Sequence, residues 1–263
     1  MATPEQFQNW YDEYTGSNWP LAVPPSMIVT TDQQKWIRAN SICKYYLKNI
    51  AGKTFLDFGC GAGHVTIAAS QQAAKSIGYD IEDRFVDDYG SEYDQSKFLC
   101  TTDWKQVANN SKYDIVMLYD VLDHIKPDRV EAALRTVASA CRPDTDVYVR
   151  CHPWTSPHGG HVYNHINRAF AHFFMDQDRL DKYQDEYVNQ ITKPMFTYRK
   201  WFYDYGFEII KSDKILYPWD ANKNSELFKG DKAKHLDNSN MSGPGWQTAV
   251  FSIEFVDFVL RIK

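Results

Sequence analysis

Short runs of apolar residues recur along the chain, and segments with helical spacing of apolar residues separate them. Continuous apolar runs of about four to eight residues are typical of strands that are buried on both faces. Between two such runs, residues 127–141 carry Val130, Leu134 and Val137 at helical spacing. The pattern predicts an α/β protein with strands at residues 54–58, 76–80, 98–100, 113–119, 147–151, 207–210 and 248–255.

The residues that precede the first predicted strand carry helix signals. Thr-x-x-Gln capping patterns begin at Thr3 and at Thr31. After the first pattern, four aromatic residues share one helical face, which favours core packing over a substrate-facing wall: Phe7, Trp10, Tyr11 and Tyr14. The second helix should end near residues 51–52. We therefore expect a helical cap over residues 1–50.

A glycine-rich turn, G-C-G-A-G at residues 59–63, follows the strand predicted at 54–58. Glycines accept tight backbone conformations and carry no Cβ, so such a turn before a helix brings a ligand against the backbone. A dinucleotide fingerprint needs another glycine where this chain has His64. Asp57 stands before the turn, and an acidic residue suits a ligand's ammonium group better than a phosphate. A glycine turn that binds no ligand is the alternative.

The order of three motifs resembles that of the class I S-adenosylmethionine (SAM) methyltransferases. D-x-G-x-G-x-G at residues 57–63 is similar to their motif I, YDIVMLYDVLDHI at 113–125 to their fourth strand, and YDYGFEII at 203–210 to the start of their terminal hairpin. The resemblance covers roughly residues 52–151 and 195–256. It implies a doubly wound, mostly parallel, seven-stranded sheet that carries SAM across its strand ends.

Within this resemblance, the chain reads as one methyltransferase-like domain over residues 1–263 with two additions. The helical cap, residues 1–50, precedes the sheet. An inserted helical segment after the fifth strand, residues 152–194, is expected to bind the substrate. Neither addition resembles a family motif.

The resemblance also implies which residues hold the cofactor. The methionine part would be held by Asp57, Gly59, Gly61 and Gly63. The ribose would be held by Asp80, the adenine by Asp103 with Trp104 beside the ring, and Tyr119 would lie near the sulfonium. Asp103 also suits a helix N-cap, and the two roles are compatible.

Net charge, cysteine distribution and the length of the apolar runs limit the partners and the location that the sequence allows. The net charge of −5 argues against broad nucleic-acid binding, which depends on Lys and Arg contacts to phosphates. The five cysteines are dispersed without a C-x-x-C pair, which is typical of reduced thiols and of a cytoplasmic protein. No apolar run approaches membrane-spanning length, and no signal peptide opens the chain, so no membrane association is expected.

Asp120, Asp123 and His124 follow the fourth strand, on the side where this fold places the methyl acceptor. A carboxylate–imidazole pair could take the proton released when a hydroxyl or an amine is methylated, so His124 is a catalytic candidate. Many members of the family carry similar residues here without using them in chemistry, which is the alternative. The strand ends in LYDV, which is not the motif of the enzymes that methylate base amino groups.

Five of the eight histidines fall between residues 152 and 172. If residues 161–175 form a helix, His161, His165 and His172 share one stripe with Arg168. A metal site is one interpretation, but no ligand framework supports it and we expect no metal. A solvated helix face is another. We favour a substrate pocket with catalytic His152 and His161 and substrate-binding Trp154, His158 and His165.

The sequence thus predicts a SAM-dependent methyltransferase that acts on an oxygen or nitrogen of a small or medium-sized acceptor. A nucleic-acid methyltransferase is the alternative that the aromatic and histidine content permits. A non-catalytic SAM-binding subunit is an alternative of another class, because the motif residues permit binding without turnover.

Overall fold

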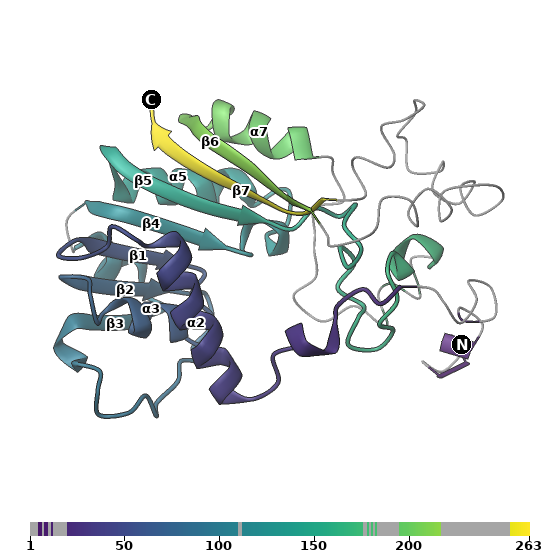
Figure 1. The fold of residues 1–263 in the computed structure, drawn as a ribbon. Helices are drawn as coiled ribbons and strands as arrows, with labels where there is room; N and C mark the ends of the chain where they lie inside the picture. The colour runs from purple at the N-terminus through teal and green to yellow at the C-terminus, as the bar shows by residue number, and fades with distance from the viewer. Residues whose placement is uncertain are drawn as a thin grey trace.

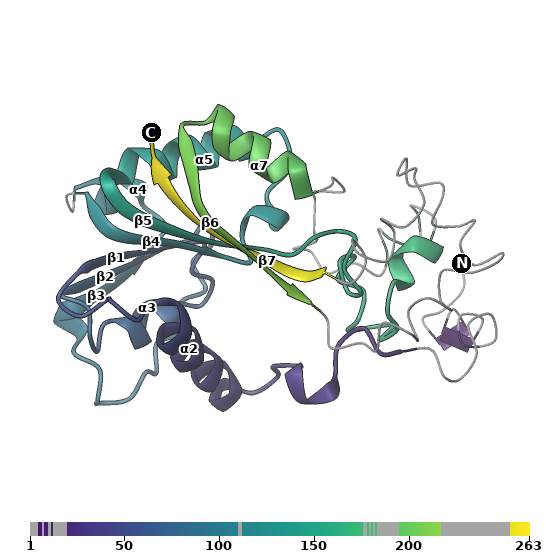
Figure 2. The ribbon, with the colours of Figure 1, turned by 45° about the horizontal axis from the view of Figure 1, so that its top comes forward.

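The computed structural model describes residues 5, 6, 8, 9, 12, 20–109, 112–175, 178, 180, 182, 195–216 and 253–263. Its centre is one twisted sheet with helices on both faces (Figures 1 and 2). Within the described ranges, no helix combines the length and the apolar character needed to cross a membrane.

The sheet has seven strands in the order β3-β2-β1-β4-β5-β7-β6. β7 runs antiparallel to β5 and β6, and the other neighbouring pairs are parallel. The strands are β1 (Thr54–Phe58), β2 (Lys75–Tyr79), β3 (Phe98–Thr101), β4 (Tyr113–Tyr119), β5 (Cys141–Cys151), β6 (Phe207–Leu216) and β7 (Ile253–Ile262). The predicted doubly wound, mostly parallel, seven-stranded sheet is confirmed.

The last strand lies further along the chain than residues 248–255, where the apolar pattern places it. Val256, Phe258 and Leu260 are buried, whereas Asp257 and Arg261 alternate with them toward the opposite face. The two charged side chains are satisfied by ion pairs to residues of β5. A strand with one charged face has no continuous apolar run, so the prediction ended too early.

Each face of the sheet packs against its own helices (Figure 2). α4 (Trp104–Ala108), α5 (Val130–Ala140) and α7 (Met195–Asp204) cover one face, and α2 (Asp32–Tyr46) and α3 (His64–Ala69) lie on the other. Strand residues alternate between the two cores, so that Leu56 and Val116 join the first core and Phe55 and Met117 join the second. This period of two is the expected pattern for a sheet covered on both sides.

α2 begins as the sequence predicts, with Thr31 and Gln34 forming a reciprocal capping box. It ends at Tyr46, before the predicted end near residues 51–52, and Leu47 and Ile50 then pack into the core behind β1. α2 also contacts α3 along the sheet face. The cap predicted over residues 1–50 is otherwise untested, since its aromatic stripe of Phe7, Trp10, Tyr11 and Tyr14 lies outside the described residues.

The segment after β5 is not the helix expected over residues 161–175. Residues 152–170 form successive turns, and the 3₁₀ helix η4 (Ala171–Phe174) follows them. His161 and Phe170 have positive φ angles of 51° and 62°, which a helix does not allow. The apolar spacing misled the prediction because Val162, Ile166 and Ala171 form a small core of their own within these turns. Most of residues 176–194 lie outside the described residues.

Candidate active site

The glycine turn after β1 has the left-handed backbone that its sequence predicts. Gly59, Gly61 and Gly63 have φ angles of 77°, 54° and 85°. A Cβ on Gly59 would lie 2.6 Å from Val121, and one on Gly63 would lie 2.6 Å from the Cys100 sulfur. A Cβ on Gly61 would meet nothing within 4 Å. Packing thus requires two of the glycines, whereas the third borders open space where a ligand can approach the backbone.

Asp57, at the end of β1, is buried beneath this turn. One carboxylate oxygen accepts a hydrogen bond from the Thr66 hydroxyl of α3 at 2.9 Å. Burial raises the pKa of Asp57 to about 7, the Thr66 hydrogen bond opposes that shift, and the nearby charge of Asp80 adds to it. A cationic group placed against this carboxyl would favour its ionised form.

Asp80 follows β2 and ties the glycine turn to it. Its carboxylate accepts hydrogen bonds from the backbone N–H of Gly61 at 2.8 Å and of Glu82 at 3.2 Å. The side chain is thereby held beside the open space in front of Gly61, where it is predicted to bind a ribose. Each carboxylate oxygen keeps a second lone pair for a hydroxyl donor.

Asp103 and Trp104 lie at the start of α4. The Asp103 carboxylate accepts a hydrogen bond from the backbone N–H of Lys105 at 2.9 Å, which is the N-cap role that the sequence also allowed. The Trp104 ring packs edge-on against Phe58 and Tyr79. The two residues therefore stand at the carboxyl end of β3, and their predicted contacts with adenine stay predictions.

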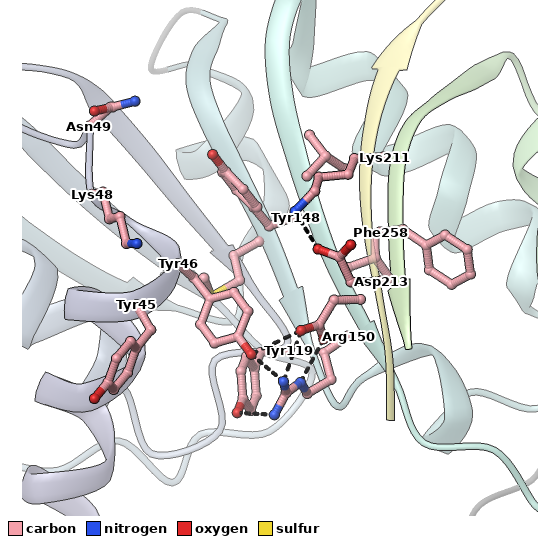
Figure 3. A pocket seen from close by; sticks show the side chains of 14 residues that line it. Tyr45, Tyr46, Lys48, Asn49, Tyr119, Tyr148, Arg150, Lys211, Asp213 and Phe258 are labelled. Atoms are coloured by element: carbon pink, nitrogen blue, oxygen red, sulfur yellow. Dashed lines mark hydrogen bonds and ion pairs between the residues drawn. The ribbon is translucent and has the colours of Figure 1, made fainter. Parts of the chain in front are cut away.

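Tyr119, the last residue of β4, belongs to a hydrogen-bonded network that the sequence analysis missed (Figure 3). Arg150 of β5 binds Asp257 with two hydrogen bonds of 2.8 and 2.9 Å and donates another of 2.8 Å to the Tyr119 hydroxyl. Arg150 also donates to the hydroxyl of Tyr46 at the end of α2. A charged residue inside the apolar run VYVRC was the signal for this network, since buried arginines are rare unless paired.

The same network borders a cavity of about 330 Å³ on the sheet face beside α2 (Figure 3). Its walls come from α2 and from β4, β5, β6 and β7, with Tyr45, Tyr148 and Asp213 among them. Of the site residues that the sequence predicts, Tyr119 is the one that lines it. The cavity is therefore separate from the glycine turn and from the histidine segment.

The chain turns sharply after β4. Asp120 has a positive φ of 55° and pairs with Arg38 of α2 at 3.0 Å. Burial raises the pKa of Asp120, and the charge of Arg38 opposes this shift. Asp123 and His124 follow on the 3₁₀ helix η3 (Leu122–His124), with 3.7 Å between Oδ2 of Asp123 and Nε2 of His124. Strained backbone of this kind is concentrated at functional sites.

Four histidines converge beyond the ends of β4 and β5, and we name them the imidazole cluster: His124, His152, His158 and His161. Nδ1 of His152 lies 2.9 Å from Nε2 of His161, and Nε2 of His152 lies 2.7 Å from the Ser156 hydroxyl. The His152 and His158 ring centroids are 3.9 Å apart, and those of His124 and His161 are 4.8 Å apart.

Two other predicted substrate residues lie outside the cluster. His165 is exposed, and the turns that replace the expected helix separate it from His161. Trp154 is partly buried and stacks edge-on with His172, whose ring nitrogen is 2.8 Å from the Trp154 carbonyl oxygen. The stripe of His161, His165 and His172 that a helix would have produced is therefore absent.

Burial keeps His152, His158 and His161 neutral. It lowers the pKa of His158 to about 3 and holds the pKa values of His152 and His161 well below the usual range, and the neighbouring imidazoles add to each shift. Asp123 is completely buried, and burial raises its pKa well above the usual value. Neutral imidazoles keep one nitrogen that can accept a proton, a hydrogen bond or a metal ion.

The glycine turn is in direct contact with the loop that carries η3. Gly59 packs directly against Val121, and Val121 immediately precedes η3, which carries Asp123 and His124. The backbone N–H groups of Gly59 and Cys60 both donate to the Tyr79 carbonyl oxygen at the end of β2. Loops after β1, β2, β4 and β5 thus meet at the carboxyl edge of the sheet, where open α/β sheets bind their ligands.

Comparison with known proteins identifies the family. The family model described as a methyltransferase domain matches residues 35–212, which is more than half of the chain. The chain therefore belongs to the methyltransferase-domain family and is a methyltransferase. No curated protein matches it.

Two solved structures show the same fold. A SAM-dependent methyltransferase from Archaeoglobus fulgidus is 16% identical with a TM-score of 0.51, and the match covers 87% of this chain and 94% of that one. One from Mesorhizobium loti is 15% identical with a TM-score of 0.52, and the match covers 86% and 97%. The family and the fold confirm the predicted class of enzyme, the class I SAM-dependent methyltransferases.

Proposed function

We propose that the protein transfers the methyl group of SAM to an oxygen or nitrogen atom of a small or medium-sized acceptor. The observation that carries this proposal is the direct packing of the glycine turn against the loop of the imidazole cluster, through Gly59 and Val121. A SAM molecule bound in the open space beside Gly61 would then have its sulfonium methyl group near the imidazole cluster.

The proposed cofactor contacts follow from the chemistry of the turn. Asp57 lies below the turn as the counter-charge for the ammonium group of the methionine part, and Gly59, Gly61 and Gly63 present backbone to it. Asp80 would accept the ribose hydroxyls. Asp103 and Trp104 at the end of β3 would flank the adenine, and Tyr119 at the end of β4 would lie near the sulfonium.

In the proposed reaction, an acceptor lone pair attacks the methyl carbon in line with the sulfonium. The bond from acceptor to carbon forms, the carbon–sulfur bond breaks, and S-adenosylhomocysteine leaves with the bonding electrons. The acceptor proton passes to a neutral nitrogen of the imidazole cluster, for which His124, His152 and His161 are the candidates. In-line placement supplies most of the rate, because the sulfonium itself is a reactive methyl donor.

The acceptor would lie among the turns after β5. Trp154 and His158 are proposed to contact the acceptor. His165, which lies outside the imidazole cluster, is proposed to contact it as well. Their ring nitrogens and aromatic surfaces suit a small molecule of mixed polarity. The net charge of −5 supports a small acceptor over a nucleic acid.

The cytoplasm is the proposed location. All five cysteines lie in the described part of the chain and are free thiols. Burial raises the pKa of the Cys43 and Cys141 thiols to about 12, which keeps them unreactive.

A panel assay with methyl-labelled SAM tests the function. The protein is incubated with small hydroxyl and amine acceptors, with RNA and with DNA, and the label in each fraction is counted. Label in a small acceptor supports the proposal. Label only in RNA or DNA would establish the alternative substrate class. Tight SAM binding without transfer to any acceptor would favour a non-catalytic subunit.

A further inference from the structure

We propose that Asp123, His124 and His161 form a site for one divalent transition-metal ion of the zinc type, with an open coordination position toward the methyl acceptor. One ligand atom from each of these side chains lies within 4.8 Å of the others. The two loops that carry them follow neighbouring parallel strands, β4 and β5. No metal spacing is visible in the sequence, because the ligands come from residues 123–124 and 161.

The separations suit such an ion after a small movement of the side chains. Zinc bonds to imidazole nitrogen and carboxylate oxygen are about 2.0–2.2 Å long, so ligand atoms around a tetrahedral ion are roughly 3.3–3.5 Å apart. Oδ2 of Asp123 and Nε2 of His124 are already 3.7 Å apart. Movements of about 1 Å at the side-chain tips would bring the other separations, which are at most 4.8 Å, into this range.

Asp123 supplies the independent observation that points to a cation. Its side chain is completely buried, and among the described residues neither carboxylate oxygen accepts a hydrogen bond of normal geometry, although the backbone amides of Asp123 and His152 face it. An ionised carboxylate in such a place is costly unless a positive charge lies against it. A metal ion bound by Asp123, His124 and His161 would provide that charge.

His161 is held as metal-binding histidines are commonly held. One ring nitrogen is 2.9 Å from Nδ1 of His152, and His152 in turn is 2.7 Å from the Ser156 hydroxyl. A hydrogen bond at one nitrogen sets the tautomer and orientation of the ring, leaving the other nitrogen for the metal. The positive φ of 51° at His161 adds backbone strain, which persists where a side chain has a defined task.

Two imidazoles and one carboxylate are a donor set used for catalytic zinc, with the remaining position left to water or substrate. The site would then bind the acceptor through its oxygen or nitrogen atom and orient it toward the sulfonium. This role of the ion rests on the proposed function, and with His124 and His161 bound to the ion His152 would be the proton acceptor among the three candidates. The metal site itself rests on the three side chains alone.

The test measures metal binding without any assay of activity. Protein without a polyhistidine tag is stripped with a chelator and titrated with Co²⁺, whose visible absorption reports bound imidazole and carboxylate, and zinc content is measured by mass spectrometry after dialysis. We expect one ion per chain. His124→Gln and His161→Gln should weaken Co²⁺ binding at least tenfold, whereas the matched His165→Gln should bind as the wild type does.

Asp123→Asn completes the set, with thermal unfolding to confirm that each variant is folded. If this buried substitution prevents folding, the two glutamine variants still decide. Wild-type protein that binds neither Co²⁺ nor Zn²⁺, or equal binding by His124→Gln and His165→Gln, would overturn the site. Methyl transfer by fully metal-free protein would leave the proposed function standing without the ion, and a bound ion without methyl transfer would support the site alone.

Discussion

Nδ1 of His152 and Nε2 of His161 lie 2.9 Å apart, so one of the two rings donates a hydrogen bond and the other accepts it. Both rings are neutral, because burial lowers both pKa values. The contact joins the end of β5 to the turn that follows it, and the same pair lies next to His158 and Ser156. A change at His152 should therefore affect the acceptor side of the site and leave the glycine turn unchanged.

His152→Ala should lower kcat by roughly 10²–10⁴, the usual contribution of a positioned acid or base. The affinity for SAM should stay nearly unchanged, because the substituted ring is not part of the glycine turn. Steady-state kinetics and calorimetry measure the two quantities, and thermal unfolding shows whether the variant is folded. A folded variant with wild-type kcat would remove the imidazole cluster from the mechanism.

Gly61→Val should lower SAM affinity more than about tenfold, which is 1.4 kcal/mol. A Cβ at Gly61 faces open space, so the added side chain would occupy the volume proposed for the ligand. Gly52→Val is the matched control: Gly52 also has a positive φ, 71°, with nothing within 4 Å of a Cβ, but it lies in the turn before β1. Equal SAM affinities for the two variants would contradict the cofactor site.

SAM binding should release a proton from Asp57. The pKa of this carboxyl is about 7 in the free protein, and an ammonium group beside it would lower that pKa in the complex. SAM affinity should therefore rise with pH up to about 7 and level off above it. Calorimetry in two buffers of different ionisation enthalpy measures the released proton, and Asp57→Asn should abolish it. Proton-neutral binding at pH 6 by the wild type would show that the ammonium group lies elsewhere.

Breaking the Arg150–Asp257 pair should destabilise the fold. The side chains are 10% and 19% exposed and join β5 to β7, so Arg150→Met leaves a poorly hydrated carboxylate. We expect a loss of about 2–3 kcal/mol, somewhat below the roughly 3–5 kcal/mol of a fully buried pair. Urea unfolding measures it.

The control for this prediction is the same substitution at an exposed pair. Arg135→Met removes the partner of Glu131 at side-chain exposures of 64% and 51%, and it should cost less than about 1 kcal/mol. Adding Asp257→Asn to Arg150→Met should recover part of the loss, because the unpaired charge is then gone. Similar losses at Arg150 and Arg135 would mean that the network does not stabilise the sheet.

Local pattern predicts the parts of the fold that are buried on both faces. Residues 115–119 form a continuous apolar run, and β4 spans this run together with Tyr113 and Asp114. β7 was misplaced because Asp257 and Arg261 interrupt its apolar residues, and their ion-pair partners are more than a hundred residues away. The turns around His161 were predicted as a helix, since apolar spacing alone does not reveal a positive φ.

The residues of the candidate site also fall into two groups: those that one short segment of sequence reveals, and those that only the fold brings together. Asp57 and the glycine turn are visible in the sequence because the ligand-facing backbone comes from one short segment. The approach of His124 to His161 and the Arg150 network depend on strand order, which brings distant segments together. The sequence indicates both the histidine-rich segment after β5 and the Asp123–His124 pair after β4, but the structure is needed to show that the two lie together and that Asp123 is buried.

A crystal structure of the protein with S-adenosylhomocysteine tests directly whether the glycine turn and the imidazole cluster form one site. We expect the amino-acid part to lie over Gly61 and Asp57, Asp80 to bind the ribose, and the sulfur to face the imidazole cluster. A ligand in the cavity beside Tyr46, or a sulfur directed away from His152 and His161, would contradict it.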